Sequence, residues 1–179
     1  SDGGSGISTY EYALGATSGG TEFVSWTSAG TATGDTLTGL SLLTEGATYY
    51  LSVRATDVAG NMSDPDTSDG ITIDLTAPAG STVSDGTGAD ISYSGSDTTL
   101  SANWVAFTET VSGVQKYEYA IGTTSGGTEL VTWTDNDTAT SVTKSGLTLS
   151  NGTAYYISVR ATDNAGNVST TIISDGVMV

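Results

Sequence analysis

Two acidic segments are the first candidates for chemistry in this sequence. Asp57 and Asn61 frame one D-x-A-G-N segment, and Asp163 and Asn167 frame a second copy of it. Carboxylate and amide oxygens are the ligands that Ca²⁺ prefers, so each segment is a candidate calcium loop. The alternative is a tight turn between two strands, in which Asp bonds its own backbone and Gly takes a positive φ. The residues alone leave both interpretations open.

Two further acidic residues favour calcium near the middle of the chain. Asp74 opens the segment 74–78, which ends in a proline, and Asp85 follows soon after it. We predict that a calcium site at a domain junction combines Asp57 or Asn61 with one or both of these residues. The sequence requires no cofactor, and calcium is the metal that its oxygen ligands favour.

Two tryptophans indicate a rival kind of site. Trp26 and Trp133 each follow a copy of the segment SGGTE, and exposed aromatic rings can stack on the faces of sugars. A glycan-binding platform at these two residues is one interpretation. The other is that both rings cover the end of a core, because each shares its strand parity with a nearby valine, Val24 or Val131.

The composition excludes several classes of function. The 179 residues include no Cys and no His, which removes disulfides, thiol nucleophiles and histidine-dependent catalysis. Four Lys and Arg residues against 20 Asp and Glu residues give a net charge of −16, which is too negative for nucleic-acid binding. No apolar run is long enough to insert into a membrane.

The acidic residues on predicted strands are expected to be structural. Glu11 should meet Arg54, and Glu118 should meet Arg160, as cross-strand pairs on neighbouring strands. Such pairs form an outward ladder and not a catalytic dyad. We therefore expect the chain to have no enzymatic activity.

The elements that position these residues are repeated. Residues 10–27 and 117–134 are identical at 14 of 18 positions, and residues 48–61 and 154–167 are identical at 11 of 14. A period of about 106 residues is too long for a solenoid or a propeller blade. Each copy is therefore predicted to be a whole domain.

The two copies start differently. The second copy has about thirty residues, 80–111, ahead of its repeated segment, whereas the first copy has nine. We predict an incomplete domain at residues 1–77, without its opening strands, and a complete domain at residues 78–179. We expect that the chain is a piece of a longer protein, or that another chain supplies the strands by exchange, since an open sheet edge invites pairing.

Short strand signals separated by Gly, Asp, Asn and Ser clusters predict an all-β fold with two β-sandwiches. In residues 153–162, alternation places Tyr155, Ile157, Val159 and Ala161 on the core face. The same pattern in the first copy places Tyr49, Leu51, Val53 and Ala55 inside. The strands predicted for the first copy are 7–15, 23–27, 35–40, 47–56 and 62–73. Those predicted for the second copy are 81–84, 99–105, 114–122, 130–134, 140–146, 153–162 and 168–178.

These segments resemble fibronectin type III domains. Trp104, in LSANW, matches the core tryptophan on strand B of that family, and residues 149–155, ending in Tyr155, match its E–F corner. Leu43 and Tyr49 occupy the same corner in the first copy. The resemblance implies that the corner tyrosine packs inward and that its hydroxyl bonds back to the loop backbone. It also implies that the first copy lacks strands A and B.

The repeated segments are similar to tandem fibronectin-like or immunoglobulin-like modules of large bacterial surface proteins of the adhesin type. That resemblance implies a non-enzymatic structural spacer or adhesive repeat, extracellular or on the bacterial cell surface, whose partners are neighbouring repeats of the same chain. In such modules, similar turns sit close to inter-domain calcium sites. The alternative is a module that binds a glycan or a protein and is accessory to a secreted enzyme.

Overall fold

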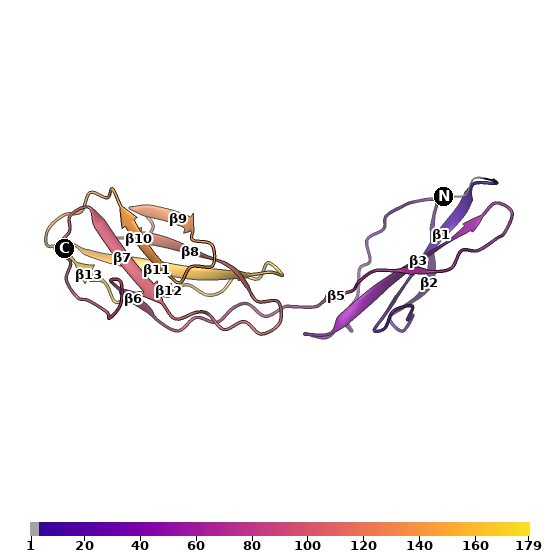
Figure 1. The fold of residues 1–179 in the computed structure, drawn as a ribbon, viewed down its shortest axis with the longest axis horizontal. Helices are drawn as coiled ribbons and strands as arrows, with labels where there is room; N and C mark the ends of the chain where they lie inside the picture. Colours follow the sequence, from indigo (N-terminus) through magenta and orange to yellow (C-terminus); the bar gives the residue numbers. More distant parts are fainter. Residues whose placement is uncertain (1–3) are drawn as a thin grey trace. The chain divides into compact units, whose positions relative to one another are not determined.

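The computed structural model describes residues 4–179, and in that range the chain forms β-strands and no helix (Figure 1). The described range accordingly holds no helix long and apolar enough to cross a membrane. The chain divides into a first unit that ends at Asp74 and a second unit, Leu75–Val179. The boundary predicted from the sequence lies between residues 77 and 78, three residues further on. The all-β class predicted from the alternation of residues is confirmed.

The second unit is a β-sandwich of two antiparallel sheets (Figure 1). The smaller sheet has the strand order β10-β7-β6, formed by Ser141–Ser145, Thr99–Trp104 and Val83–Asp85. The larger sheet has the order β12-β11-β8-β9, with β13 also paired to β11. Its strands are β8 Val114–Gly122, β9 Val131–Asp135, β11 Ala154–Asp163, β12 Ile172–Ile173 and β13 Val177–Met178.

The core of the second unit lies between these two sheets. Ile157 and Val159 of β11 are fully buried, as the period-two pattern predicts. They belong to one cluster with Leu100 and Trp104 of β7, on the facing sheet. The Trp104 ring meets the Tyr117 ring edge-on, with 5.7 Å between the two centroids. Strand β7 therefore covers the inner face of the larger sheet.

The first unit consists of one sheet in the described residues. Its strand order is β2-β1-β3-β4, with β5 also paired to β3. Its strands are β1 Ile7–Gly15, β2 Val24–Gly30, β3 Thr48–Asp57, β4 Asp66–Thr67 and β5 Ile71–Thr72. Within residues 4–74 there is no counterpart of β6 or β7, so the first repeat lacks the strands A and B that the resemblance requires.

The missing sheet has two consequences that correct the sequence analysis. Residues 35–40 form no strand, because their counterpart β10 pairs with β7, which the first unit lacks. Leu51 and Val53, predicted to lie inside, are 39% and 38% exposed, whereas the equivalent Ile157 and Val159 are 0% exposed. Both errors have one cause, namely that no second sheet packs on this face.

The last strand of each repeat is also shorter than predicted. Residues 62–73 and 168–178 were expected to be continuous strands, but each is split into two short pieces. Gly70 and Gly176 break these segments with φ values of 99° and 101°. Such backbone conformations are readily reached by glycine and interrupt the ladder.

The tyrosine corner implied by the resemblance is confirmed in both repeats. The Tyr155 hydroxyl accepts a hydrogen bond from the Ser150 backbone N–H at 2.9 Å. The Tyr49 hydroxyl accepts one from the Thr44 backbone N–H at 2.8 Å. Both rings are 3% exposed, so each tyrosine packs inward while its hydroxyl bonds the preceding loop.

Candidate functional site

The D-x-A-G-N segments form closed turns after the long strands β3 and β11. The two carboxylate oxygens of Asp57 accept hydrogen bonds of 2.8 Å from the backbone N–H and the side-chain amide of Asn61. Asp163 accepts equivalent bonds from Asn167, at 2.8 and 2.9 Å. The hydrogen bonds from Asn61 hold the pKa of Asp57 below its ordinary value. This is the geometry expected for the turn interpretation.

The four predicted calcium ligands are divided between the two units of the chain. Asp57 and Asn61 contact each other within the first unit, of which Asp74 is the last residue. Asp85 ends β6 in the second unit, where its carboxylate lies among those of Asp90 and Asp175. A calcium site that combines Asp57, Asn61, Asp74 and Asp85 therefore stays a prediction.

The cluster around Asp85 contains two residues that the sequence analysis did not select. Asp90 lies in the loop between β6 and β7, and Asp175 lies between β12 and β13. One carboxylate oxygen from each of the three residues lies within 4.8 Å of the others. The signal in the sequence was weak. Of the three aspartates within residues 64–69 of the first copy, only Asp69 has an acidic counterpart in the second copy, which is Asp175.

The two tryptophans lie on the outer face of their sheets, each against an arginine. The Arg54 guanidinium carbon is 4.2 Å from the centre of the Trp26 ring, and that of Arg160 is 4.3 Å from the Trp133 ring. Arg160 follows Val159, so it projects from β11 on the side opposite the core. The expectation that both rings cover the end of the core is therefore wrong.

A β-bulge causes this change of face. In the second unit Ile121 pairs with Val131, whereas Tyr119 pairs with Thr134, so β9 contains one extra residue between the two pairs. Val131 is buried in the core, and Trp133 is turned to the outer face. The same register shift separates Val24 from Thr27 in the first unit. Whether the rings bind sugars stays a prediction.

The arginines also make the predicted cross-strand pairs. Arg54 Nε donates to Glu11 Oε2 at 2.9 Å, and Arg160 Nε donates to Glu118 Oε2 at 2.9 Å. Lys116 Nζ extends the second pair, at 3.6 Å from Glu118 Oε1. The outward ladder expected from the strand neighbours is thus confirmed in both repeats.

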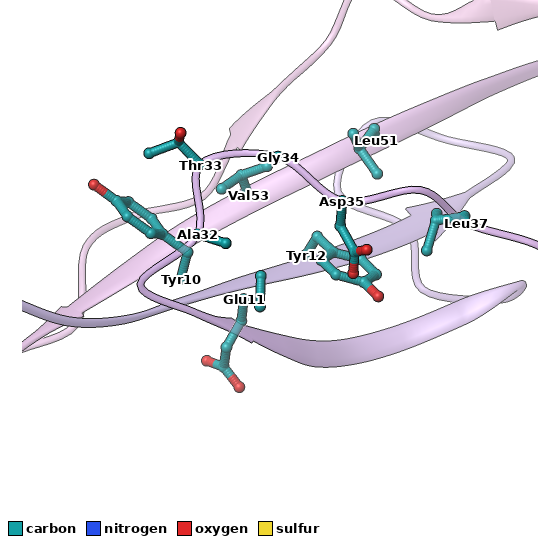
Figure 2. A pocket seen from close by; sticks show the side chains of 11 residues that line it. Tyr10, Glu11, Tyr12, Ala32, Thr33, Gly34, Asp35, Leu37, Leu51 and Val53 are labelled. Carbon is teal, nitrogen blue, oxygen red and sulfur yellow. The ribbon is translucent and has the colours of Figure 1, made fainter.

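A hollow of about 260 Å³ lies on the first unit (Figure 2). Figure 2 shows it between β1, β3 and the segment that contains Asp35 and Leu37. The Tyr12 hydroxyl donates a hydrogen bond to the Asp35 carboxylate, and this bond raises the pKa of Tyr12. The larger apolar and aromatic side chains that line the hollow are Tyr10, Tyr12, Leu37, Leu51 and Val53.

The hollow corresponds to the sandwich core of the other repeat. Tyr117, Tyr119, Ile157 and Val159, which are equivalent to Tyr10, Tyr12, Leu51 and Val53, are all buried in the second unit. There the inner face of the larger sheet is covered by β7 and its neighbours. The hollow is therefore the core face of an incomplete sandwich.

The paired sheets and the two tyrosine corners define the class of the molecule: the chain is a tandem of fibronectin type III-like repeats, of which the first lacks strands A and B. Solved structures with this fold include the FN1–FN3 domains of chicken CNTN1, with a TM-score of 0.52, 17% identity and coverage of 97% of this chain and 55% of that one. Domains of titin match with a TM-score of 0.53, 14% identity and coverage of 96% and 54%.

Among curated proteins, the chain is similar to Exoglucanase B of Cellulomonas fimi, with 39% identity over 174 residues. That match covers 93% of this chain and 14% of the exoglucanase. Chitinase A1 of Niallia circulans is 36% identical over 139 residues, which is 76% of this chain and 18% of the chitinase. No family model matches the sequence. The chain thus spans less than a fifth of the length of these relatives.

Proposed function

We propose that this chain is a non-catalytic module of a larger extracellular bacterial protein, and that it acts as a structural spacer between that protein's other domains. One observation carries the proposal: 93% of the chain aligns with only 14% of a bacterial exoglucanase. A chitinase, which is named for a different polymer, also aligns with most of this chain, 76%, over only 18% of its own length. A segment shared by enzymes with different substrates is not what selects the substrate.

The chemistry of the two repeats supports a structural role. In the pairs Glu11–Arg54 and Glu118–Arg160, each carboxylate is bonded to the guanidinium of the neighbouring strand, so these charged groups are already engaged. The corner tyrosines are buried and bonded to the backbone. A net charge of −16 favours solubility and disfavours association between such modules. An adhesive role of the same repeats, on a bacterial cell surface, is the second form of this proposal.

A second candidate function is glycan binding. In that case the chain would assist a secreted enzyme as a binding module and not as a spacer. The position of Trp26 and Trp133 on the outer sheet faces favours it, since an indole on that face is partly open to solvent. One face of each ring is already against a guanidinium. Sugar stacking would therefore use the remaining part of the ring.

One binding experiment separates the two functions. The purified chain is mixed with insoluble cellulose and, separately, with insoluble chitin, and the protein left in the supernatant and the released reducing sugar are measured. The spacer proposal expects the chain to stay in the supernatant and no sugar to be released. Retention that disappears in Trp133→Ala or Trp26→Ala would establish the glycan-binding function instead. Sugar release by the chain itself would overturn the non-catalytic assignment.

A further inference from the structure

Three carboxylates of the second unit converge where the end of its first strand contacts the turn before its last strand. Asp85 is the final residue of β6, Asp90 lies in the loop that follows, and Asp175 precedes Gly176 and β13. One oxygen from each side chain lies within 4.8 Å of the others. Asp90 also accepts a hydrogen bond of 2.7 Å from the Asp85 backbone N–H, which fixes the loop against the strand.

Asp85 is the unusual member of this cluster because its side chain is fully buried. One of its oxygens accepts a hydrogen bond of 3.1 Å from the Gly176 backbone N–H. The other, Oδ1, is buried and has no hydrogen-bond partner. A buried carboxylate oxygen without a partner is costly, and in native proteins such atoms are nearly always paired with a protein group, an ordered water or an ion.

No cationic side chain of the described residues forms an ion pair with this cluster. Three of the four basic residues, Arg54, Lys116 and Arg160, are engaged with other acids. The pKa of Asp85 is raised to about 6, chiefly by burial and also by the charges of Asp90 and Asp175, while the Ser174 hydroxyl and the Gly176 N–H act in the opposite direction. The cluster thus combines three acids, one deeply buried, with no compensating charge from the protein.

We propose that Asp85, Asp90 and Asp175 bind a calcium ion. Three carboxylates from three separate loops or strand ends offer the hard oxygen ligands that calcium takes, with room for water in the remaining positions. The absence of His and Cys from the sequence disfavours zinc and copper at such a site. The ion neutralises the cluster and supplies the partner of the buried Asp85 Oδ1.

The site would link the two ends of the second unit. Asp85 belongs to the first strand of that unit, and Asp175 belongs to the segment that leads into its last strand. A calcium ion between them would hold β6 against the turn before β13. This site is distinct from the junction site predicted from the sequence, because all three ligands lie within Leu75–Val179.

The chain contains a matched control for this site. Asp69-Gly70 of the first unit is equivalent to Asp175-Gly176 of the second, and both aspartates are exposed. The first unit has no counterpart of β6 in its described residues, so Asp69 has no equivalent of Asp85 beside it. Asp175→Asn and Asp69→Asn therefore make the same change at two equivalent turns, only one of which belongs to the proposed site.

The experiment is a calcium titration of the intact 179-residue chain after removal of metal with a chelator, followed by calorimetry and by thermal unfolding. We expect heat of binding and a rise of several degrees in the melting temperature at about 1–10 mM calcium. Asp175→Asn is expected to weaken binding by about tenfold or more. Asp69→Asn is expected to leave binding unchanged.

Two results of this titration would overturn the proposal. One is the absence of both heat and melting shift in the unmodified chain. The other is an equal calcium response in Asp175→Asn and in the unmodified chain. Asp85→Asn is a further variant, because it removes the buried charge: it is expected to raise the melting temperature without calcium and to abolish the calcium shift. A calcium shift that survives Asp85→Asn would place the ion elsewhere.

Discussion

On the outer face of the sheet that contains β3 and of the sheet that contains β11, one arginine is shared between a carboxylate and an indole ring. Arg160 donates to Glu118 at 2.9 Å while its guanidinium carbon lies 4.3 Å from the centre of the Trp133 ring. The side chains are partly exposed, so the ion pair is worth on the order of 0.2–1 kcal/mol and the cation–π contact on the order of 0.5–1 kcal/mol. The arginine, the carboxylate and the indole together therefore contribute modestly to stability, and the same arrangement occurs in both units.

A single glutamate closes the turn between β8 and β9, and it makes stability depend on pH. Glu129 Oε1 accepts hydrogen bonds from the Thr123 hydroxyl at 2.7 Å and the Thr123 backbone N–H at 2.6 Å. These bonds lower the pKa of Glu129 from 4.5 to about 2. Because the folded pKa is the lower one, the stabilisation is complete above about pH 4.5 and is lost as the pH falls toward 2.

We therefore predict that Glu129→Gln removes part of the acid sensitivity of the second unit. The variant should be less stable than the unmodified chain at neutral pH, and the difference should shrink as the pH falls from about 4.5 toward 2. Denaturant unfolding at a series of pH values measures this. Asp97→Asn, at another exposed carboxylate of the same unit, is the control. A difference that stays constant over this range would contradict the assignment.

At the scale of the elements, the TSGGTE turn of each repeat is packed against the end of a long strand. A Cβ atom on Gly122, at the end of β8, would lie 2.5 Å from the carbonyl carbon of Gly127 and 2.6 Å from its Cα. Gly15 and Gly20 approach each other in the same way in the first unit. Contact between two backbones thus explains Gly20 and Gly127 of this motif, whereas Gly19 and Gly126 take positive φ values.

We predict that Gly122→Ala destabilises the second unit by about 1–3 kcal/mol, because the added methyl group forces two backbone segments apart. Urea unfolding of the variant provides the measurement. Gly95→Ala is the matched control, since a Cβ there meets no atom within 4 Å and the change should be nearly neutral. Equal effects of the two substitutions would show that the close approach is not a constraint.

Equivalent core positions in the two sheets should differ in energy. Ile157 is 0% exposed, and its counterpart Leu51 is 39% exposed. We expect Ile157→Ala to cost about 2–5 kcal/mol and Leu51→Ala to cost about 1 kcal/mol. Hydrogen exchange followed by mass spectrometry reports each unit separately through its own peptides. Similar losses at the two positions would mean that the face around Leu51 is covered in solution.

Much of the fold follows from sequence pattern, because period-two alternation and cross-strand neighbours are local properties. The alternation in β11 and the pairs Glu11–Arg54 and Glu118–Arg160 were predictable for this reason. The face of Trp133 was not, since one extra residue in β9 reverses the parity that the prediction assumed. Asp90 and Asp175 could not be selected from the sequence. They lie close to Asp85 only because the end of β6 adjoins the segment before β13, and no periodic pattern in the sequence predicts which strand ends are neighbours.

At the scale of the whole molecule, the two repeats have the same sheet, but within residues 4–179 only the second repeat has a covering sheet. The counterparts of Tyr10, Tyr12 and Val53 are buried under β7 in the second unit. The hollow in Figure 2 is the surface that this covering sheet would occupy. The first unit should therefore gain stability from any segment that supplies the missing strands.

We predict that residues 78–110, joined in front of Gly4 in place of residues 1–3, complete the first unit. The graft supplies copies of β6 and β7, and it should slow amide exchange in β1 and β3 because their inner face becomes buried. Hydrogen exchange of these strands measures the effect. A graft in which Leu100 and Trp104 are both replaced by Ser is the control. Unchanged exchange with the unmodified graft would show that this face is not an unfilled core.

The spacer role is tested most directly by the rate of polymer hydrolysis in an engineered fusion. The chain is placed between the catalytic domain of a cellulase and a cellulose-binding domain, and the fusion is compared with one in which the two domains are joined directly. The account predicts equal rates on a soluble substrate and a higher rate on insoluble cellulose when the chain is present. Equal rates on both substrates, with and without the chain, would contradict it.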